Sequence, residues 1–125
     1  MPEEAWEPYR DQLTDEGRIL LNVGSFVVRS PGATVLIDTG LGDGDHGMEH
    51  SSSGQLMNDM SERGISPDDI DVVAITHLQL DHVGWNMVLR NDAYEPTFRN
   101  AKYWIPKADW DLFTRRAGMK MFSYI

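Results

Sequence analysis

The sequence predicts a domain of the α/β class, because short apolar runs alternate with amphipathic segments. Residues 33–38 (ATVLID) and residues 72–75 (VVAI) are typical of buried strands. Residues 55–63 between them have the spacing of a short helix. The chain has 125 residues, the length of one ordinary domain, so a multidomain organisation is excluded.

The first half of the chain predicts a hairpin, a loop and a helix. Residues 18–30 form an apolar strand segment with Gly24 as a bend, and a turn at Pro31-Gly32 leads into residues 33–38. Residues 39–54 form a polar loop with five glycines and three serines, and loops of this length are usually functional. The helix at 55–63 ends at Gly64.

The second half predicts strands separated by short helices. Ser66 and Pro67 open a single helical turn before the strand at 72–75. We expect a helical turn at 83–89, a strand at 102–105 and a helix at 106–116. Three aromatic side chains are expected in or facing the core, namely Trp104, Trp110 and Phe113.

Composition excludes several classes of protein. No apolar run approaches the roughly 20 residues that span a bilayer, and the first ten residues have no signal-peptide pattern. Cysteine is absent, which excludes disulfides and thiolate sites. A net charge of −9 disfavours nucleic acid. We expect no nucleic-acid or membrane partner, and we further expect a small-molecule substrate and a cytoplasmic location.

Metal-ligand side chains follow the predicted strand at 72–75. His77, Asp81 and His82 lie just beyond its carboxyl end, where the chemistry of α/β sheets collects. In an extended segment, residues 77, 79 and 81 project to the same side. Two imidazoles and a carboxylate suit zinc, iron or manganese. The structural alternative is that Asp81 caps a helix and the histidines are only hydrogen-bonded.

The segment Thr76-His77-Leu78-Gln79-Leu80-Asp81-His82 closely resembles the T-H-x-H-x-D-H motif of the metallo-β-lactamase superfamily. Residues 35–40 resemble the family strand that ends in D-T-G, residues 67–71 its turn before the motif, and residues 96–103 its approach to the next strand. Together these segments cover residues 18–112. The resemblance is greatest to the branch that includes the acyl-homoserine lactonases, which are quorum-quenching enzymes.

This resemblance implies the N-terminal half of a four-layer αββα sandwich, with residues 1–125 as one partial domain whose C-terminal half is absent. His77 and position 79 would hold a first zinc ion, and Asp81 and His82 a second. Asp38 and Thr76 would hydrogen-bond to ligands and orient them. The intact protein would hydrolyse an ester, lactone, thioester or amide through metal-activated water, with Asp81 also passing a proton to the leaving group.

Two departures from the family pattern favour an alternative function. Position 79 is glutamine, whose neutral amide oxygen is a weaker zinc donor than imidazole, and no histidine follows His82. The apolar residues 119–125 also indicate that the sequence stops inside a domain. We therefore expect the 125-residue chain alone to be inactive. The alternative is a catalytically inactive half-domain that serves binding or assembly, as a homo-oligomer or with a complementing C-terminal half.

The polar loop supplies a second, weaker group of metal-type side chains: Asp43, Asp45, His46, Glu49 and His50. Their spacing does not fit a calcium-binding loop. Contact with substrate is the better interpretation, although no substrate-binding residue is assigned. The loop's three serines lack the G-x-S-x-G pattern, which disfavours a serine hydrolase.

Overall fold

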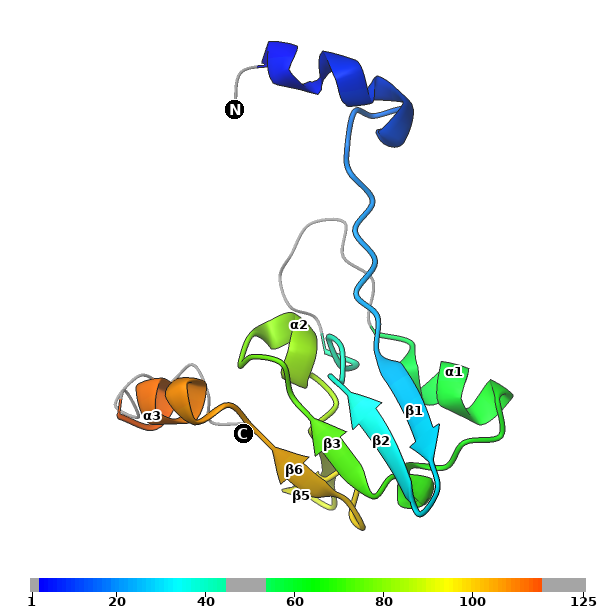
Figure 1. Ribbon diagram of the computed structural model, residues 1–125, viewed down its shortest axis with the longest axis vertical. Helices are drawn as coiled ribbons and strands as arrows, with labels where there is room; N and C mark the ends of the chain where they lie inside the picture. The colour runs from blue at the N-terminus through cyan, green and yellow to red at the C-terminus, as the bar shows by residue number, and fades with distance from the viewer. Residues whose placement is uncertain (1–2, 45–53, 116–125) are drawn as a thin grey trace.

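The computed structural model describes residues 3–44 and 54–115. Figure 1 shows its elements, which are in chain order η1 (Glu3–Gln12), β1 (Phe26–Ser30), β2 (Ala33–Ile37), α1 (Leu56–Glu62), η2 (Pro67–Asp69), β3 (Val72–Ala74), α2 (Leu80–Val83), β4 (Met87–Arg90), β5 (Ala93–Pro96), β6 (Lys102–Trp104) and α3 (Lys107–Arg115). The main sheet has the order β1-β2-β3-β6, and β4 pairs with β5 separately. β2, β3 and β6 run parallel, so the predicted α/β class is confirmed.

The predicted hairpin is present, but its first strand is shorter than expected. β1 pairs antiparallel with β2 through a turn at Gly32, where φ is +88°. Residues 18–25 are outside the sheet and lead away from it toward η1, which the sequence did not predict (Figure 1). Leu20 is 85% exposed and Leu21 is 80% exposed. Apolar residues favour a strand, but a strand also needs a pairing partner, and this segment makes only the bridge between Leu13 and Ile19.

In the described part of the connection from β2 to β3, the helix and the helical turn follow the prediction. α1 lies within residues 55–63, and Gly64 follows it with φ of +66°. Ser66 and Asp69 form a reciprocal capping box around η2. Asp71 then fixes the start of β3 beside β2, because its carboxylate accepts the Thr34 N–H at 2.7 Å.

The helical turn predicted at 83–89 is wrong. α2 starts earlier and ends at Val83, and residues 87–90 form β4, which pairs antiparallel with β5. Asn91 and Asp92 join the two strands with φ of 49° and 64°, the left-handed pair that a tight two-residue hairpin requires. The apolar run at 87–89 is too short for its periodicity to separate helix from strand.

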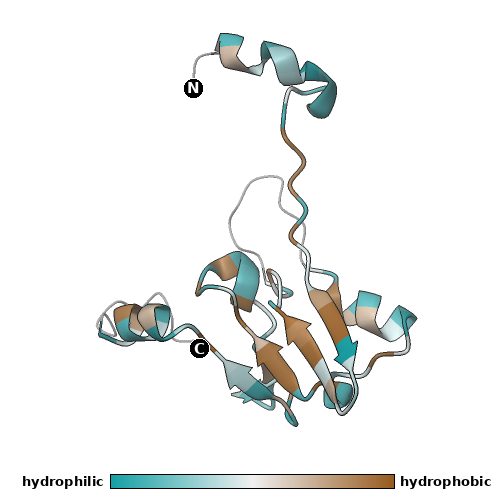
Figure 2. Ribbon diagram, viewed as in Figure 1, coloured by the Kyte–Doolittle hydropathy of each residue, from teal (hydrophilic) through white to brown (hydrophobic). Residues whose placement is uncertain are grey.

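The sheet has one buried face and one exposed face. Leu36 and Val73 on the buried face are fully covered, and they form the core with Met60, Ile70, Ile75, Leu78 and Phe98. The register places Phe26, Val28 and Trp104 on the opposite face, where all three are exposed. Figure 2 shows β1, β2 and β3 as largely apolar and β6 as more hydrophilic.

Two predictions about tryptophan are therefore wrong. Trp104 is 63% exposed because it lies on the uncovered face of β6, and Trp110 is 47% exposed on α3. Phe113 is partly buried and packs against the core, as expected. No helix in residues 3–44 and 54–115 is long and apolar enough to cross a membrane.

Candidate metal centre

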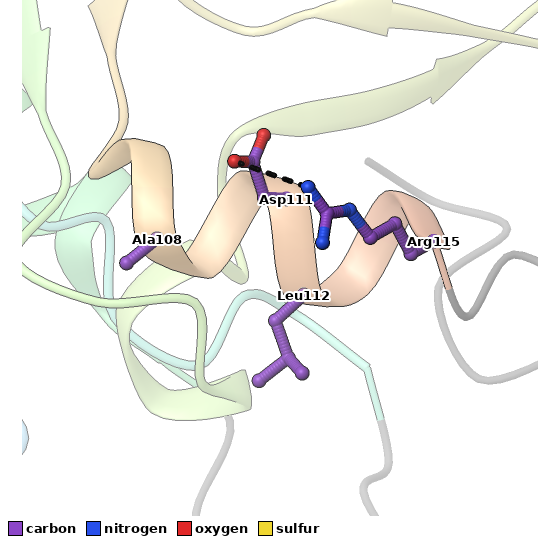
Figure 3. A pocket seen from close by; sticks show the side chains of 4 residues that line it. All are labelled: Ala108, Asp111, Leu112 and Arg115. Carbon is purple, nitrogen blue, oxygen red and sulfur yellow. Dashed lines mark ion pairs between the residues drawn. The ribbon is translucent and has the colours of Figure 1, made fainter.

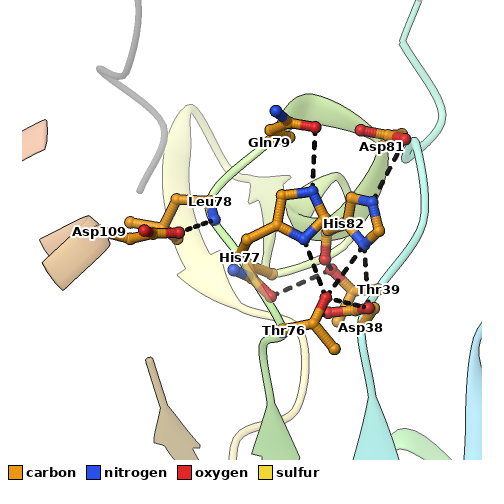
Figure 4. Close-up of polar contacts among 10 residues, drawn as sticks. Asp38, Thr39, Thr76, His77, Leu78, Gln79, Asp81, His82 and Asp109 are labelled. Carbon is orange, nitrogen blue, oxygen red and sulfur yellow. Dashed lines mark hydrogen bonds and ion pairs between the residues drawn. The ribbon is translucent and has the colours of Figure 1, made fainter. Parts of the chain in front are cut away.

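The site lies at the carboxyl ends of two neighbouring parallel strands. Asp38 follows β2, Thr76 and His77 follow β3, and the chain then enters α2, which carries Asp81 and His82. Parallel strands that pair in register end at the same edge of the sheet, so residues far apart in sequence meet there. Figure 4 shows these side chains gathered around the Asp38 carboxylate and the two imidazole rings.

Asp38 is the centre of the hydrogen-bond network. Its Oδ1 accepts the Thr76 N–H at 2.7 Å, and its Oδ2 accepts the Thr76 hydroxyl at 2.7 Å and contacts His82 Nδ1 at 2.9 Å. Burial acts to raise the pKa of Asp38, but these hydrogen bonds from Thr76 and His82 outweigh it and hold the pKa below its ordinary value. The network therefore holds Asp38 as a carboxylate, in a backbone conformation with φ of 58°.

This carboxylate sets the protonation pattern of both imidazoles. A carboxylate only accepts hydrogen bonds, so the contact places the proton of neutral His82 on Nδ1 and leaves the lone pair on Nε2. The Thr76 hydroxyl gives its proton to Asp38 and can accept another from His77 Nδ1, which is 3.1 Å away. His77 then also presents Nε2 as a lone pair, the form of imidazole that binds metals.

The two Nε2 atoms face different partners. Nε2 of His82 lies 3.3 Å from Oδ2 of Asp81, and Nε2 of His77 lies 2.9 Å from Oε1 of Gln79. When His77 presents a lone pair, the Gln79 amide rotated by 180° would donate to it. The two rings are adjacent, with centroids 3.9 Å apart and planes tilted by 49°. The motif thus forms two donor pairs side by side.

One of these pairs has the spacing of metal ligands. Two donors of one tetrahedral zinc ion, each bonded at its normal length, lie about 3.4 Å apart. The separation of 3.3 Å between His82 Nε2 and Asp81 Oδ2 fits that value. The donor set of imidazole nitrogen and carboxylate oxygen also fits zinc, iron or manganese. Among the described residues, however, no three His, Asp or Glu side chains are grouped so that they could hold one ion.

The site also depends on a backbone contact that the motif alone did not reveal. The Thr39 N–H donates to the His82 carbonyl at 2.8 Å, and the Gly84 N–H donates to the Gly40 carbonyl at 2.7 Å. A Cβ on Gly84 would lie 1.9 Å from the carbonyl carbon of Leu41. The loop after β2 and the end of α2 therefore touch backbone to backbone, and only glycine fits at position 84.

A buried polar cluster below the site was also missed by sequence reasoning. The Thr39 hydroxyl lies 3.1 Å from Oδ1 of Asn86, and the Asn86 carbonyl accepts the hydroxyl of Tyr103 at 3.1 Å. Thr39 belongs to the D-T-G segment and was within reach of sequence analysis, whereas Asn86 and Tyr103 carry no comparable pattern. Trp85, three residues after the motif, is partly buried.

The other predicted residues do not join the site. Asp43 is exposed, while Asp45, His46, Glu49 and His50 lie outside the described residues. A separate hollow lies on α3, lined by Ala108, Asp111, Leu112 and Arg115 (Figure 3). Its two charged groups face each other at 3.9 Å, and Asp111 also binds Lys107 at 2.6 Å. This hollow offers no unpaired charge for a ligand.

Comparison with known proteins points to one family. The sequence model of the metallo-beta-lactamase superfamily matches residues 18–121. A solved structure of AidC, described as a dizinc quorum-quenching lactonase in complex with a product, N-hexnoyl-L-homoserine, is 27% identical over 71% of this chain with a TM-score of 0.61. No curated protein sequence matches the chain significantly.

Two further structures share the fold at lower identity. A probable metal-dependent hydrolase from Staphylococcus aureus is 19% identical over 92% of this chain, and the hydrolase AbOPH of the beta-lactamase superfamily is 20% identical over 90% of it. Both have a TM-score of 0.70. The chain spans 28% of the AidC chain, 42% of the staphylococcal chain and 37% of the AbOPH chain.

Proposed function

Because this chain belongs to the metallo-beta-lactamase superfamily, we propose that it provides the motif half of a zinc-dependent hydrolase site. The observation that carries the proposal is the position of His82. Its Nδ1 is held by Asp38 at 2.9 Å, and its Nε2 faces the Asp81 carboxylate at a spacing suited to shared metal binding. The same network explains why Asp38 and Thr76 accompany the motif.

We assign the ligands as two pairs. Asp81 and His82 would hold one ion, and His77 with Gln79 would hold the other more weakly, because a neutral amide oxygen is a poorer donor than imidazole. Zinc is the ion we propose, with iron and manganese as substitutes for the same nitrogen and oxygen donors. When bound, such ions would supply a hydroxide nucleophile near neutral pH and polarise the substrate carbonyl.

The protein groups have separate tasks in this proposal. Asp38 and Thr76 keep the proton of each imidazole on Nδ1, which leaves Nε2 available. Asp81 is 42% exposed, so its carboxylate is accessible to a substrate and would pass a proton to the leaving group. The backbone contact between Gly84 and Gly40 keeps α2 and the Asp38 loop in one arrangement.

A cyclic ester is the substrate class that the comparisons favour. AidC, itself described as a lactonase, is 27% identical over 71% of this chain. We therefore place lactones first, ahead of acyclic esters, thioesters and amides. The substrate-contacting residues are left unassigned.

A second function is favoured by Gln79. A chain that holds metal poorly at the His77 pair would serve as a binding or assembly module, either with a second copy of itself or with a complementing partner. This interpretation predicts stable association without hydrolysis, whereas the hydrolase interpretation requires turnover.

The test is a zinc titration followed by a hydrolysis assay. The hydrolase interpretation predicts that the wild-type chain binds zinc and that His82→Gln binds it at least about tenfold more weakly. Asp43→Asn is the matched control, because that carboxylate is exposed and separate from the motif. Zinc binding by the chain, with hydrolysis of a lactone or ester when a complementing C-terminal half is supplied, supports the first function. Zinc binding with stable self-association and no turnover even with that half supplied supports the second, and absence of zinc binding contradicts both ligand assignments.

A further inference from the structure

Asp109 on α3 contacts the loop that carries the motif. Its Oδ2 accepts the backbone N–H of Leu78 at 2.8 Å, across 31 positions in the sequence. Figure 4 shows this hydrogen bond beside the two imidazoles. Leu78 separates His77 from Gln79, so Asp109 binds the backbone between two side chains that the proposed function places in the metal site.

The contact fixes one peptide unit at both ends. The peptide between His77 and Leu78 donates its N–H to Asp109, and its carbonyl accepts the Gln79 N–H at 3.1 Å. A peptide group is planar, so holding its N–H and its carbonyl fixes the orientation of the whole unit. The side chains on either side then leave the backbone in set directions, and His77 Nε2 meets the Gln79 amide.

The burial of Leu78 makes this hydrogen bond more important. Leu78 is 2% exposed and belongs to the hydrophobic core, so its backbone lies close to the core. A backbone N–H that loses its partner at such a place carries a desolvation cost. Sheet pairing does not satisfy this group, because β3 ends four residues earlier, at Ala74.

The position of Asp109 suits this role. It lies in the first turn of α3, and the helix follows β6, the neighbour of β3 in the sheet. The sheet therefore sets the distance between Asp109 and the motif loop. Asp111, two residues further along the same helix, instead binds Lys107 at 2.6 Å. The two acids of one helix thus differ clearly in their contacts.

We propose that Asp109 is a positioning residue for the His77–Gln79 donor pair, acting through the Leu78 amide. The inference rests on the proposed function for the metal role of that pair, whereas the positioning itself is a property of the metal-free chain. The metal affinity of the pair and its positioning in the metal-free chain are therefore measured separately.

The experiment compares three variants by NMR and by cobalt titration. Asp109→Ala removes the acceptor, Asp109→Asn keeps an acceptor oxygen but removes the charge, and Asp111→Ala is the matched control on the same helix. In the metal-free 125-residue chain, we expect Asp109→Ala to speed hydrogen exchange of the Leu78 amide by about tenfold or more. We also expect it to shift the side-chain signals of His77 and Gln79. Asp109→Asn should stay close to the wild type, and Asp111→Ala should leave all three signals unchanged.

The cobalt titration adds the link to the site. We expect Asp109→Ala to weaken Co²⁺ binding by about tenfold, Asp109→Asn by much less, and Asp111→Ala not at all. A merely structural role would lower the melting temperature without this pattern. The inference is overturned if Asp109→Ala leaves the His77 and Gln79 signals in place, or if Asp111→Ala produces the same changes.

Two further outcomes remain decisive. If Asp109→Ala does not fold, hydrogen exchange of the Leu78 amide is compared in the wild type and in Asp109→Asn. Slow exchange in both proteins supports the inference. Rapid exchange in the wild type overturns it. If the wild-type chain binds no Co²⁺, the proposed function fails, while the positioning role is still judged from the signals of Leu78, His77 and Gln79.

Discussion

Oδ2 of Asp38 lies 2.9 Å from Nδ1 of His82, although the two residues are 44 positions apart in the chain. The same oxygen accepts the Thr76 hydroxyl, so one carboxylate connects the ends of two strands with α2, the helix that carries the last residues of the motif. Because Asp38 only accepts hydrogen bonds, it determines which nitrogen of His82 is left free. In the proposed metal site, the available nitrogen of His82 therefore depends on a residue that we do not assign as a ligand.

Replacing Asp38 by asparagine should weaken zinc binding by about 10-fold to 100-fold. The new NH₂ group would donate to His82 Nδ1, which moves the imidazole proton to Nε2, where the metal should bind. A calorimetric zinc titration measures the change, with Asp43→Asn as the control on an exposed carboxylate of the same loop. Equal affinities for Asp38→Asn and the wild type would contradict the orienting role of Asp38.

Replacing Gln79 by histidine should strengthen zinc binding and increase any hydrolytic rate. An imidazole nitrogen is a better zinc donor than an amide oxygen, and position 79 already faces His77 Nε2 at 2.9 Å. Gln79→Leu is the matched variant, since it fills similar space without a donor atom. Metal content and turnover are measured for all three proteins. If histidine and leucine behave alike, Gln79 does not limit the site.

Replacing Gly84 by alanine should destabilise the protein by about 1–3 kcal/mol or more, because the new Cβ would overlap the Leu41 backbone at 1.9 Å. Gly24→Ala is the control, since its nearest contact would be the Asn22 side chain at 3.8 Å and its effect should stay within about 0.5 kcal/mol. Urea unfolding of both variants gives the comparison. Similar midpoints for the two would show that the Gly84 contact is not tight in solution.

Tyr103 predicts a loss of stability at high pH. Burial raises the pKa of its hydroxyl above the ordinary value of 10.0, against an opposing hydrogen bond from the Phe98 N–H. The unfolded chain therefore loses this proton first, so the contribution of Tyr103 is complete below pH 10 and is lost as the pH rises through its folded pKa. Between about pH 8.5 and 11, the melting temperature should fall less steeply with rising pH for Tyr103→Phe than for the wild type. Parallel slopes would argue against burial of the hydroxyl.

The exposed sheet face predicts binding of a hydrophobic dye by the 125-residue chain, since Phe26, Val28 and Trp104 lie together on it. The pair of changes Phe26→Lys and Trp104→Lys should lower dye fluorescence and self-association. Leu112→Lys is the control, because that side chain is similarly exposed but lies on α3. A soluble monomer with a sharp cooperative melt and no dye binding would contradict this prediction.

The parts of the fold that sequence analysis predicted are those with strong local patterns. β2 and β3 are continuous apolar runs, so composition was sufficient to predict them. Ser66 caps η2 and an acidic residue follows three positions later, so spacing was sufficient to predict this helical turn. The motif residues followed directly from their place after β3. The grouping of Asp38 with Thr76 required the family resemblance, because the two residues are 38 positions apart.

The parts that were missed depend on pairing partners that composition alone does not reveal. Residues 18–25 have the composition of a strand but no neighbouring strand, and β4 needed its turn at Asn91 and Asp92 to be recognised as a hairpin. Asp109 has no sequence pattern because its partner is a backbone N–H, which every residue other than proline has. Trp104 was misplaced because an aromatic residue on a strand does not indicate which face of the sheet it occupies.

The long sequence separations around Asp38 also bear on the order of folding. Its hydrogen bond to Thr76 spans 38 residues of the chain and its contact with His82 spans 44 residues. The hairpin of β1 and β2, in contrast, closes through a two-residue turn. Closing the longer loops costs more chain entropy and belongs to the slower, non-local part of folding. The imidazoles should therefore reach their final positions when β2 and β3 pair, after the hairpin has formed. In a refolding experiment followed at individual histidines, His82 would report the last step of sheet assembly.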